Sequence, residues 1–286
     1  MLLLLIAAAL EWMAEAIPNS YTYKRDYMEQ HGSQIQTLIL GSSNAYDGLN
    51  PSVLPKAFNL ANSSQTLEDD YRLLAKYIDS MDSLQTVFVG LGYHSLGATT
   101  EDNRRTYYTI YMDLYPRWPI SKYSFEVCNP QLLLKKIIKY TVSRDVTRCD
   151  SLGQRIGHTL EAAQSGAEWW NKDVLSLVEN DRLDIGHFRL VIEENTRYVH
   201  AIVDLCNAHK VQPVIVQMPV MEEYKRKLPA EQVALMVDML QSLDSAAVCI
   251  DASDWEIPEE GWYNATHLTK EASAEFTRQL IENSEK

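Results

Sequence analysis

The sequence predicts an α/β fold in which a mainly parallel central sheet lies between two layers of helices. Three short apolar runs in the first hundred residues, at 35–40, 57–60 and 86–92, each stop at a polar or glycine-containing turn, which is typical of buried strands. A helical pattern separates the second run from the third, and this order favours parallel pairing. Two later apolar runs, at 211–219 and 247–251, complete the predicted sheet.

Helices are predicted from capping residues and from apolar positions that repeat every three or four residues. Thr66 is a suitable N-cap, and the acidic run 68–70 lies where the helix macrodipole favours negative charge. Thr269 is a similar N-cap for a final helix. The polar stretch 19–34 is interpreted as a lead-in to the first strand. The other predicted helices cover 67–78, 131–142, 188–208 and 230–243.

The length of 286 residues suits one large α/β domain, which we expect to cover 18–286. The pattern changes between about 95 and 185, where tyrosines and tryptophans gather around prolines and no strand alternation is visible. We interpret this segment as a helical insertion between core strands. Its aromatic cluster has two open interpretations, the lining of a substrate pocket or lid and the packing of the insertion itself.

The N-terminal segment 1–17 begins with ten apolar residues, fewer than the ~20 that a membrane-spanning helix needs. It is interpreted as the remnant of a signal or membrane anchor, with Ala14–Ala16 as a weak cleavage pattern. We therefore expect an extracytoplasmic location, in the cell envelope or anchored to a membrane through the N-terminus. The alternative is a buried helix at the start of a cytoplasmic protein.

Composition excludes several classes of function. A formal net charge of -13 argues against a nucleic-acid partner, which needs a dense basic surface. No Gly-x-Gly-x-x-Gly or Walker pattern occurs, so no nucleotide cofactor is expected. The four cysteines lack metal-site spacing, and pairing of Cys128 with Cys149 stays open. No metal is expected, and the histidines without partners at metal-ligand spacing are interpreted as surface or helix residues: His158, His187, His200 and His209.

Two residues far apart in the sequence suggest acyl-transfer chemistry. Ser43 follows the first predicted strand, and His267 precedes the last helix. In a parallel sheet both lie at the carboxyl-end edge, where ligands bind. Acyl transfer needs a nucleophile, a base, a group that orients the base, and donors for the oxyanion. The turns at 63–64 and 90–92 lie at the same edge and are candidates for these donors.

The ordered set of motifs resembles the SGNH (GDSL-like) hydrolase superfamily over nearly the whole chain. Gly41-Ser42-Ser43 matches the first block, 59–64 the second, 90–93 the third, and Asn264-Ala265-Thr266-His267 the last. The resemblance implies a flavodoxin-like three-layer sandwich, with a catalytic set of Ser43, His267 and Asn264. It also implies oxyanion or substrate contacts in the second and third blocks, for Ser64, Asn62 and Gly92. His94 follows the third strand near the same edge, and its two open interpretations are a substrate contact and a solvated loop residue.

Two departures from the family pattern bear on activity. Gly92 stands where an Asn side chain helps to hold the oxyanion, and one lost donor costs ~10²–10³ in rate. Asn264 stands where an Asp orients the catalytic His, and an Asn that fixes the wrong tautomer costs about 10⁴ in a serine protease. Asp251 and Asp254 are alternative partners for His267.

The sequence therefore favours a serine esterase or O-acyltransferase that acts on an acylated glycan of the cell envelope. The alternative is an SGNH-fold protein with weak or lost catalysis that binds glycans or serves in assembly.

Overall fold

The structure, a computed structural model, describes residues 1–100, 102–143, 147–165 and 170–284. The chain forms two compact units. Unit 1 comprises Met1–Gly32 and Thr100–Cys149, and unit 2 comprises Ser33–Thr99 and Asp150–Lys286.

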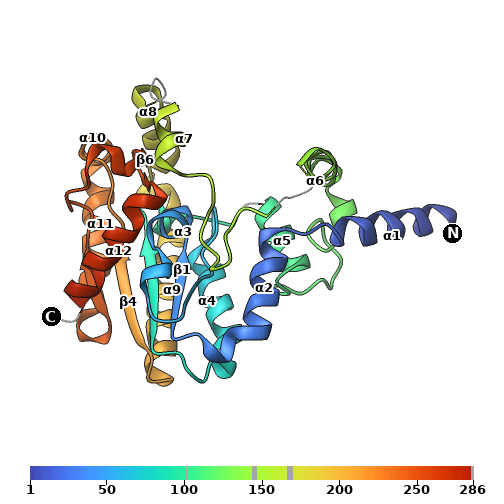
Figure 1. The fold of residues 1–286 in the computed structure, drawn as a ribbon, viewed down its shortest axis with the longest axis horizontal. Coiled ribbons are helices and arrows are strands. Elements are labelled where there is room, and N and C mark those ends of the chain that lie inside the picture. Colours follow the sequence, from blue (N-terminus) through green and yellow to red (C-terminus); the bar gives the residue numbers. More distant parts are fainter. Residues whose placement is uncertain (101, 144–146, 166–169, 285–286) are drawn as a thin grey trace. The chain divides into compact units, whose positions relative to one another are not determined.

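Unit 2 contains the central sheet that the sequence predicts. Its five strands are all parallel, in the order β2-β1-β3-β4-β5, one of the common orders of doubly wound α/β proteins. Figure 1 shows the strands side by side between helices. The strands are β1 (Thr37–Gly41), β2 (Ala57–Asn59), β3 (Thr86–Leu91), β4 (Gln212–Gln217) and β5 (Val248–Asp251).

Helices cover both faces of this sheet. α4 (Leu67–Tyr77) packs against α9 (Ile185–Ala208), which also contacts β4 and α11 (Ala230–Ser242), whereas α12 (Lys270–Ser284) packs against α3 (Ser43–Gly48). The arrangement is consistent with the predicted three-layer sandwich. Unit 2 also contains α7 (Leu160–Ser165), α8 (Trp170–Asp181), α10 (Glu222–Lys225) and a hairpin of β6 (Trp262–Asn264) and β7 (His267–Leu268).

The predicted N-caps are present. The Thr66 side chain accepts the Asp69 N–H at 3.3 Å, and the Asp69 carboxylate accepts the Thr66 N–H in return, which makes a capping box. Thr269 Oγ1 accepts the Ala272 N–H at 3.3 Å. These local signals were readable because a cap involves only neighbouring residues.

Unit 1 is helical and contains α1 (Leu2–Glu15), α2 (Ser20–His31), α5 (Asp102–Ile110) and α6 (Pro130–Ser143). The interpretation of 19–34 as a lead-in was wrong, because α2 occupies most of it. Asn19 and Thr22 form a capping box at its start. The helix lacks a clear apolar repeat. It packs through aromatic side chains, since the ring centroid of Tyr21 lies 5.2 Å from that of Tyr107. Aromatic packing therefore stabilises a helix whose sequence pattern is polar.

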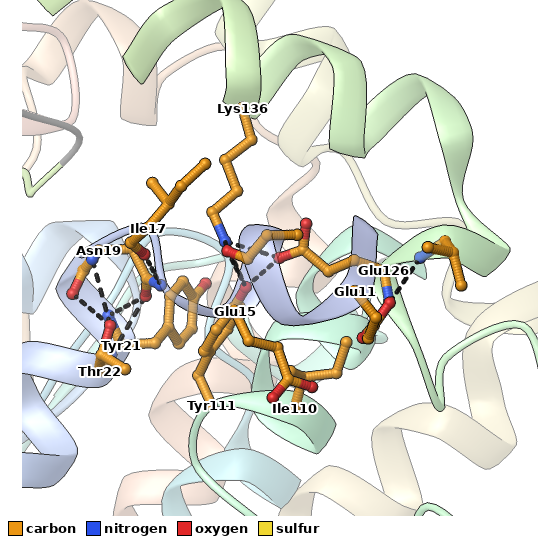
Figure 2. A network of polar contacts seen from close by, with 12 residues as sticks. Glu11, Glu15, Ile17, Asn19, Tyr21, Thr22, Ile110, Tyr111, Glu126 and Lys136 are labelled. Carbon is orange, nitrogen blue, oxygen red and sulfur yellow. Dashed lines mark hydrogen bonds and ion pairs between the residues drawn. The ribbon is translucent and has the colours of Figure 1, made fainter. Parts of the chain in front are cut away.

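A buried polar network fastens α1 within unit 1. Figure 2 shows the Lys136 ammonium group, which donates to the Ala14 carbonyl at 2.7 Å and to the Glu126 carboxylate at 2.8 Å. Tyr111 OH donates to the same carboxylate and accepts a hydrogen bond from Lys136. Burial lowers the pKa of Lys136, and the negative charge of Glu126 opposes that shift. The C-terminal half of α1 is thus part of the packed structure of unit 1.

The segment expected as one insertion, about 95–185, is divided between the units. Residues 100–149 group with the N-terminal helices, and their buried tyrosines, such as Tyr108 and Tyr111, pack inside unit 1. From residue 150 onward the chain belongs to unit 2, where the Leu152 carbonyl accepts the Asn59 N–H at 2.9 Å. All four cysteines are free thiols. Among the described residues, no helix has the length and apolar character needed to cross a membrane.

Candidate active site

The loop that carries Ser43 leaves the sheet at a glycine. Gly41 ends β1 with φ of +127°, and a Cβ there would lie 2.5 Å from the Gly90 carbonyl oxygen on the neighbouring strand. Only glycine fits this conformation and this approach. The Gly41 N–H donates to the Asp70 carboxylate at 2.9 Å. The end of β1 is therefore fixed, and Ser43 begins α3 immediately after it.

His267 reaches Ser43 from the hairpin of β6 and β7. Its Nε2 lies 2.8 Å from Ser43 Oγ, and its Nδ1 lies 2.9 Å from Asn264 Oδ1. Ser43 and His267 are separated by 224 positions in the chain. The structure therefore brings together the three residues that the sequence selected as the catalytic set.

Hydrogen bonds around Asn264 define which ring nitrogen carries the proton. The Thr266 N–H donates to Asn264 Oδ1 at 3.0 Å, so the amide turns its oxygen, which is an acceptor, toward the imidazole. Asn264 Oδ1 and Thr266 Oγ1 each lie 2.9 Å from Nδ1, and a proton on Nδ1 satisfies the Asn264 oxygen as its acceptor. Nε2 then keeps its lone pair for the Ser43 hydroxyl. This is the tautomer that a general base at Nε2 needs.

Asn44 links the serine loop to the histidine loop. Its Nδ2 donates to the Thr266 carbonyl at 2.7 Å, and its Oδ1 accepts the Ser42 hydroxyl at 3.2 Å. Asn44 is buried, so these bonds are shielded from water. The two loops are thus held in register beside the Ser43–His267 contact.

The protonation of His267 is set by its surroundings. Burial lowers its pKa to about 4, and the nearby Arg155, His158 and His94 act in the same direction. The carboxylate of Asp47, 3.8 Å from Nε2, opposes the shift. Because this pKa lies well below 7, the imidazole is neutral at neutral pH and able to accept a proton.

Three further polar residues at the site were not selected from the sequence. Asp47 Oδ1 lies 2.9 Å from Arg155 Nε, and Asp47 Oδ2 lies 3.3 Å from His158 Nδ1. The interpretation of His158 as a surface or helix residue was wrong, because its ring stacks on Tyr263 at 3.7 Å between centroids. The side chains of Asp47, Arg155 and His158 are largely buried. They form a polar group next to His267, in which Asp47 and Arg155 are an ion pair.

An irregular segment, residues 150–159, brings Arg155 and His158 to this position; it is called the strap below. The Arg155 N–H donates to the Tyr46 carbonyl at 3.3 Å, and the His158 carbonyl accepts the Lys270 N–H at 2.8 Å. Gln154 Nε2 donates to the Asp47 carbonyl at 3.1 Å. None of these partners is near the strap in sequence. No spacing in the sequence could have identified it.

The candidate oxyanion and substrate residues differ in whether their groups are already hydrogen-bonded within the protein. Ser64 is half-buried with φ of +54°, and among the described residues it has no hydrogen bond to Ser43 or His267. Asn62 is tied to the end of β1, since its N–H donates to the Gly41 carbonyl at 3.2 Å. The Gly92 N–H donates to Ser95 Oγ at 2.9 Å and is thereby occupied.

Gly92 and His94 border Asn44. A Cβ at Gly92 would lie 2.8 Å from Asn44 Oδ1 and 2.8 Å from the Cε1 atom of His94. His94 Nδ1 also lies 3.9 Å from the Asp181 carboxylate. The absence of a side chain at Gly92 therefore leaves the space that these two residues fill.

The alternative partners for His267 are engaged elsewhere. Asp254 forms an ion pair with Lys225 at 2.7 Å, and Asp251 accepts the Ser253 N–H at 3.0 Å. Within the described part of the chain, neither contacts His267. No cluster of three or more His, Cys, Asp or Glu residues suited to a metal ion occurs there either.

The sequence matched no protein-family model, and no curated protein matched it significantly.

Proposed function

We propose that this protein is a divergent SGNH-type serine esterase or O-acyltransferase that forms an acyl-enzyme on Ser43. The observation that carries the proposal is the 2.8 Å contact between Ser43 Oγ and His267 Nε2, on an imidazole whose Nδ1 faces the Asn264 oxygen. A nucleophile, a base and an orienting group in this relation are what acyl transfer requires.

The proposed reaction has two halves. Ser43 Oγ attacks the ester carbonyl carbon while its proton moves to His267 Nε2, and the tetrahedral intermediate then expels the alcohol, which takes that proton. Water or a second alcohol attacks the acyl-enzyme in the same way, with its proton passing through His267 to Ser43 Oγ. The Asp47 carboxylate, 3.8 Å from Nε2, stabilises the imidazolium that forms in each half.

Stabilisation of the oxyanion is the weaker part of the site. Ser64 remains the candidate donor, because its turn follows β2 and its backbone conformation is left-handed. Gly92 has no side-chain amide, and its N–H is occupied by Ser95. The loss of one donor lowers the rate by ~10²–10³. We therefore expect a slow enzyme.

This weakness favours a second candidate function, a glycan-binding or assembly protein of the same fold with little catalysis. For both candidates, the proposed ligand is an acylated glycan of the cell envelope. That choice is supported by the resemblance to the SGNH superfamily and by the apolar N-terminal segment.

Fluorophosphonate labelling of the purified full chain tests the proposal. We expect covalent labelling that disappears in Ser43→Ala and in His267→Ala, because the first lacks the nucleophile and the second the base. Ser52→Ala, which removes an exposed hydroxyl, is the matched control and should label like the wild type.

The outcomes separate the two candidates. Labelling that persists in Ser43→Ala contradicts the proposed nucleophile. A folded wild-type protein that does not label, and that still binds acylated glycan, supports the second candidate. Hydrolysis of a short-chain acyl ester with and without a sugar acceptor then distinguishes an esterase from a transferase.

A further inference from the structure

Two helices of unit 1, α1 and α6, turn apolar side chains outward, and each also places a charged side chain in a buried polar network. A surface helix of a globular protein has its apolar stripe facing the core. The outward apolar side chains occur in α1 and in α6 and therefore need an explanation that covers both.

In α1 the two glutamates lie on one face, which also carries apolar residues. At about 100° per residue, Ala7, Glu11, Ala14 and Glu15 share one face. Ala14 is fully buried, and Glu11 accepts the N–H groups of Glu126 and Val127 at 2.9 Å each. Figure 2 shows Glu11, Glu15, Glu126 and Lys136 in this inner network. The opposite face is apolar and exposed; it carries Leu2, Leu5, Ile6, Ala9, Leu10 and Met13.

α6 likewise combines exposed apolar side chains with a buried charged side chain. Its inner face carries Leu133 and the buried Lys136, whose ammonium group donates to Glu126. Its outer face carries a row at four-residue spacing, namely Leu134, Ile138 and Val142, all of them exposed. At 100° per residue, Lys135 and Lys139 lie along one side of this row.

The distribution of charged residues between the two units indicates which partner covers the outer faces of α1 and α6. Unit 1 holds eleven Lys and Arg residues against nine Asp and Glu, whereas unit 2 holds 15 against 30. The excess of basic residues is thus confined to the unit with the outward apolar faces. In α6 an apolar stripe is flanked by lysines, which is typical of a helix that lies in the interface of a bilayer with anionic lipids, whereas α1 contributes apolar side chains alone. A second copy of the chain would instead bury these lysines against an apolar surface, which is unfavourable.

We propose that unit 1 docks onto an anionic lipid surface, with the outer face of α1 and the outer row of α6 in the bilayer interface. The exposed apolar side chains run along the length of α1, which suits a helix that lies along the bilayer interface. The inner polar network holds α1 on unit 1, so insertion of α1 brings the whole unit to the membrane.

Sedimentation of the full chain with vesicles tests this proposal. The probes are vesicles of phosphatidylcholine alone and of phosphatidylcholine with one quarter phosphatidylglycerol. We expect tenfold or greater preference for the anionic vesicles, and loss of binding in the double variant Leu5→Asp/Ile6→Asp. Lys135→Gln and Lys139→Gln should each weaken binding to anionic vesicles about fivefold, since one lysine near such a surface contributes that much.

A matched control comes from unit 2. Leu190 in α9 is 76% exposed, against 61% for Leu5, so Leu190→Asp places an acidic side chain at an exposed apolar position outside unit 1 and compares with the single variant Leu5→Asp. Leu190→Asp should bind vesicles like the wild type. Fluorophosphonate labelling and circular dichroism show whether each variant is folded.

Trp12 gives a second measurement that needs no disruptive substitution. It is 75% exposed on α1, and brominated lipids should quench its fluorescence, with quenching reduced in Trp12→Phe. Failure of the wild type to bind either vesicle overturns the proposal, as does equal loss of binding in Leu190→Asp. A dimer in solution that Leu5→Asp/Ile6→Asp dissociates, without vesicle binding by the wild type, would assign the surface to a second copy instead.

Discussion

Asn264 and His267 are joined through an oxygen that cannot donate a hydrogen bond. Asn264 Oδ1 lies 2.9 Å from His267 Nδ1 and accepts the Thr266 N–H at 3.0 Å. The backbone donor therefore turns the amide oxygen toward Nδ1, which favours the proton on that nitrogen. The penalty that an Asn brings by fixing the wrong tautomer is avoided here by a hydrogen bond to the main chain.

Replacement of Asn264 by Asp should increase activity. The carboxylate keeps the geometry and adds a negative charge that stabilises the imidazolium, so the His267 pKa rises. We expect a gain of about tenfold in kcat/KM on a short-chain acyl ester, one pKa unit of added stabilisation. Asn264→Ala is the control and should lose activity, because nothing then orients the ring. Asn264→Asp with less activity than Asn264→Ala would contradict this role.

The pH dependence of the wild-type reaction should follow the lowered pKa of His267. The base is active when neutral, and the pKa of His267 is about 4. We therefore expect kcat/KM to hold down to about pH 5 and to fall only as pH drops through about 4. An ordinary histidine would lose activity near pH 6.5. The check is a pH profile with circular dichroism at each pH, and a midpoint between 6 and 7 would rule the assignment out.

Asp47→Asn should destabilise unit 2. Asp47 and Arg155 form a largely buried ion pair at 2.9 Å, and removal of one charge leaves the other without its partner. The free energy of unfolding should fall by about 3–5 kcal/mol in urea titrations. The control is Glu193→Gln, which breaks an exposed pair with Arg189 and should cost about 1 kcal/mol or less. Equal losses in the two variants would show that the buried pair is not a stabilising contact.

Asp70 should make stability depend on pH in the direction opposite to that of a paired carboxylate. Burial raises its pKa to about 7, although its carboxylate accepts hydrogen bonds from Gln65 and from the Gly41 N–H. The pKa of Asp70 is higher in the folded chain than in the unfolded chain, where it is ~3.9. Its contribution to the free energy of unfolding is therefore fully present below pH ~3.9 and is lost as the pH rises through about 7.

Comparison with Asp70→Asn isolates this effect, because the amide does not titrate. The free energy of unfolding of the wild type minus that of Asp70→Asn should decrease between pH 4 and pH 7. Urea titrations at several pH values measure the difference. A difference that is constant across this range would mean that Asp70 ionises as it does in the unfolded chain.

The central sheet could be predicted from the sequence because a buried parallel strand has a local signature. Each apolar run is short and ends at a turn, and parallel order follows from the helices between the runs. The meeting of Ser43 with His267 followed from the same reasoning, since both lie where strands end at one edge. The caps at Thr66 and Thr269 were readable because capping involves residues two or three positions apart.

The tertiary structure alone decided what surrounds that pair. Asp47, Arg155 and His158 meet only because a strap from beyond residue 150 crosses the site through backbone hydrogen bonds to residues distant in the sequence. α2 was missed because its stabilising contacts are aromatic rings from α5, not an apolar repeat of its own. The sequence determined the sheet and its caps, because short-range patterns encode them, and it placed Ser43 and His267 at the same edge through the order of the strands. Folding decided the charge around His267 and the outward apolar faces of α1 and α6, because both depend on contacts between distant segments.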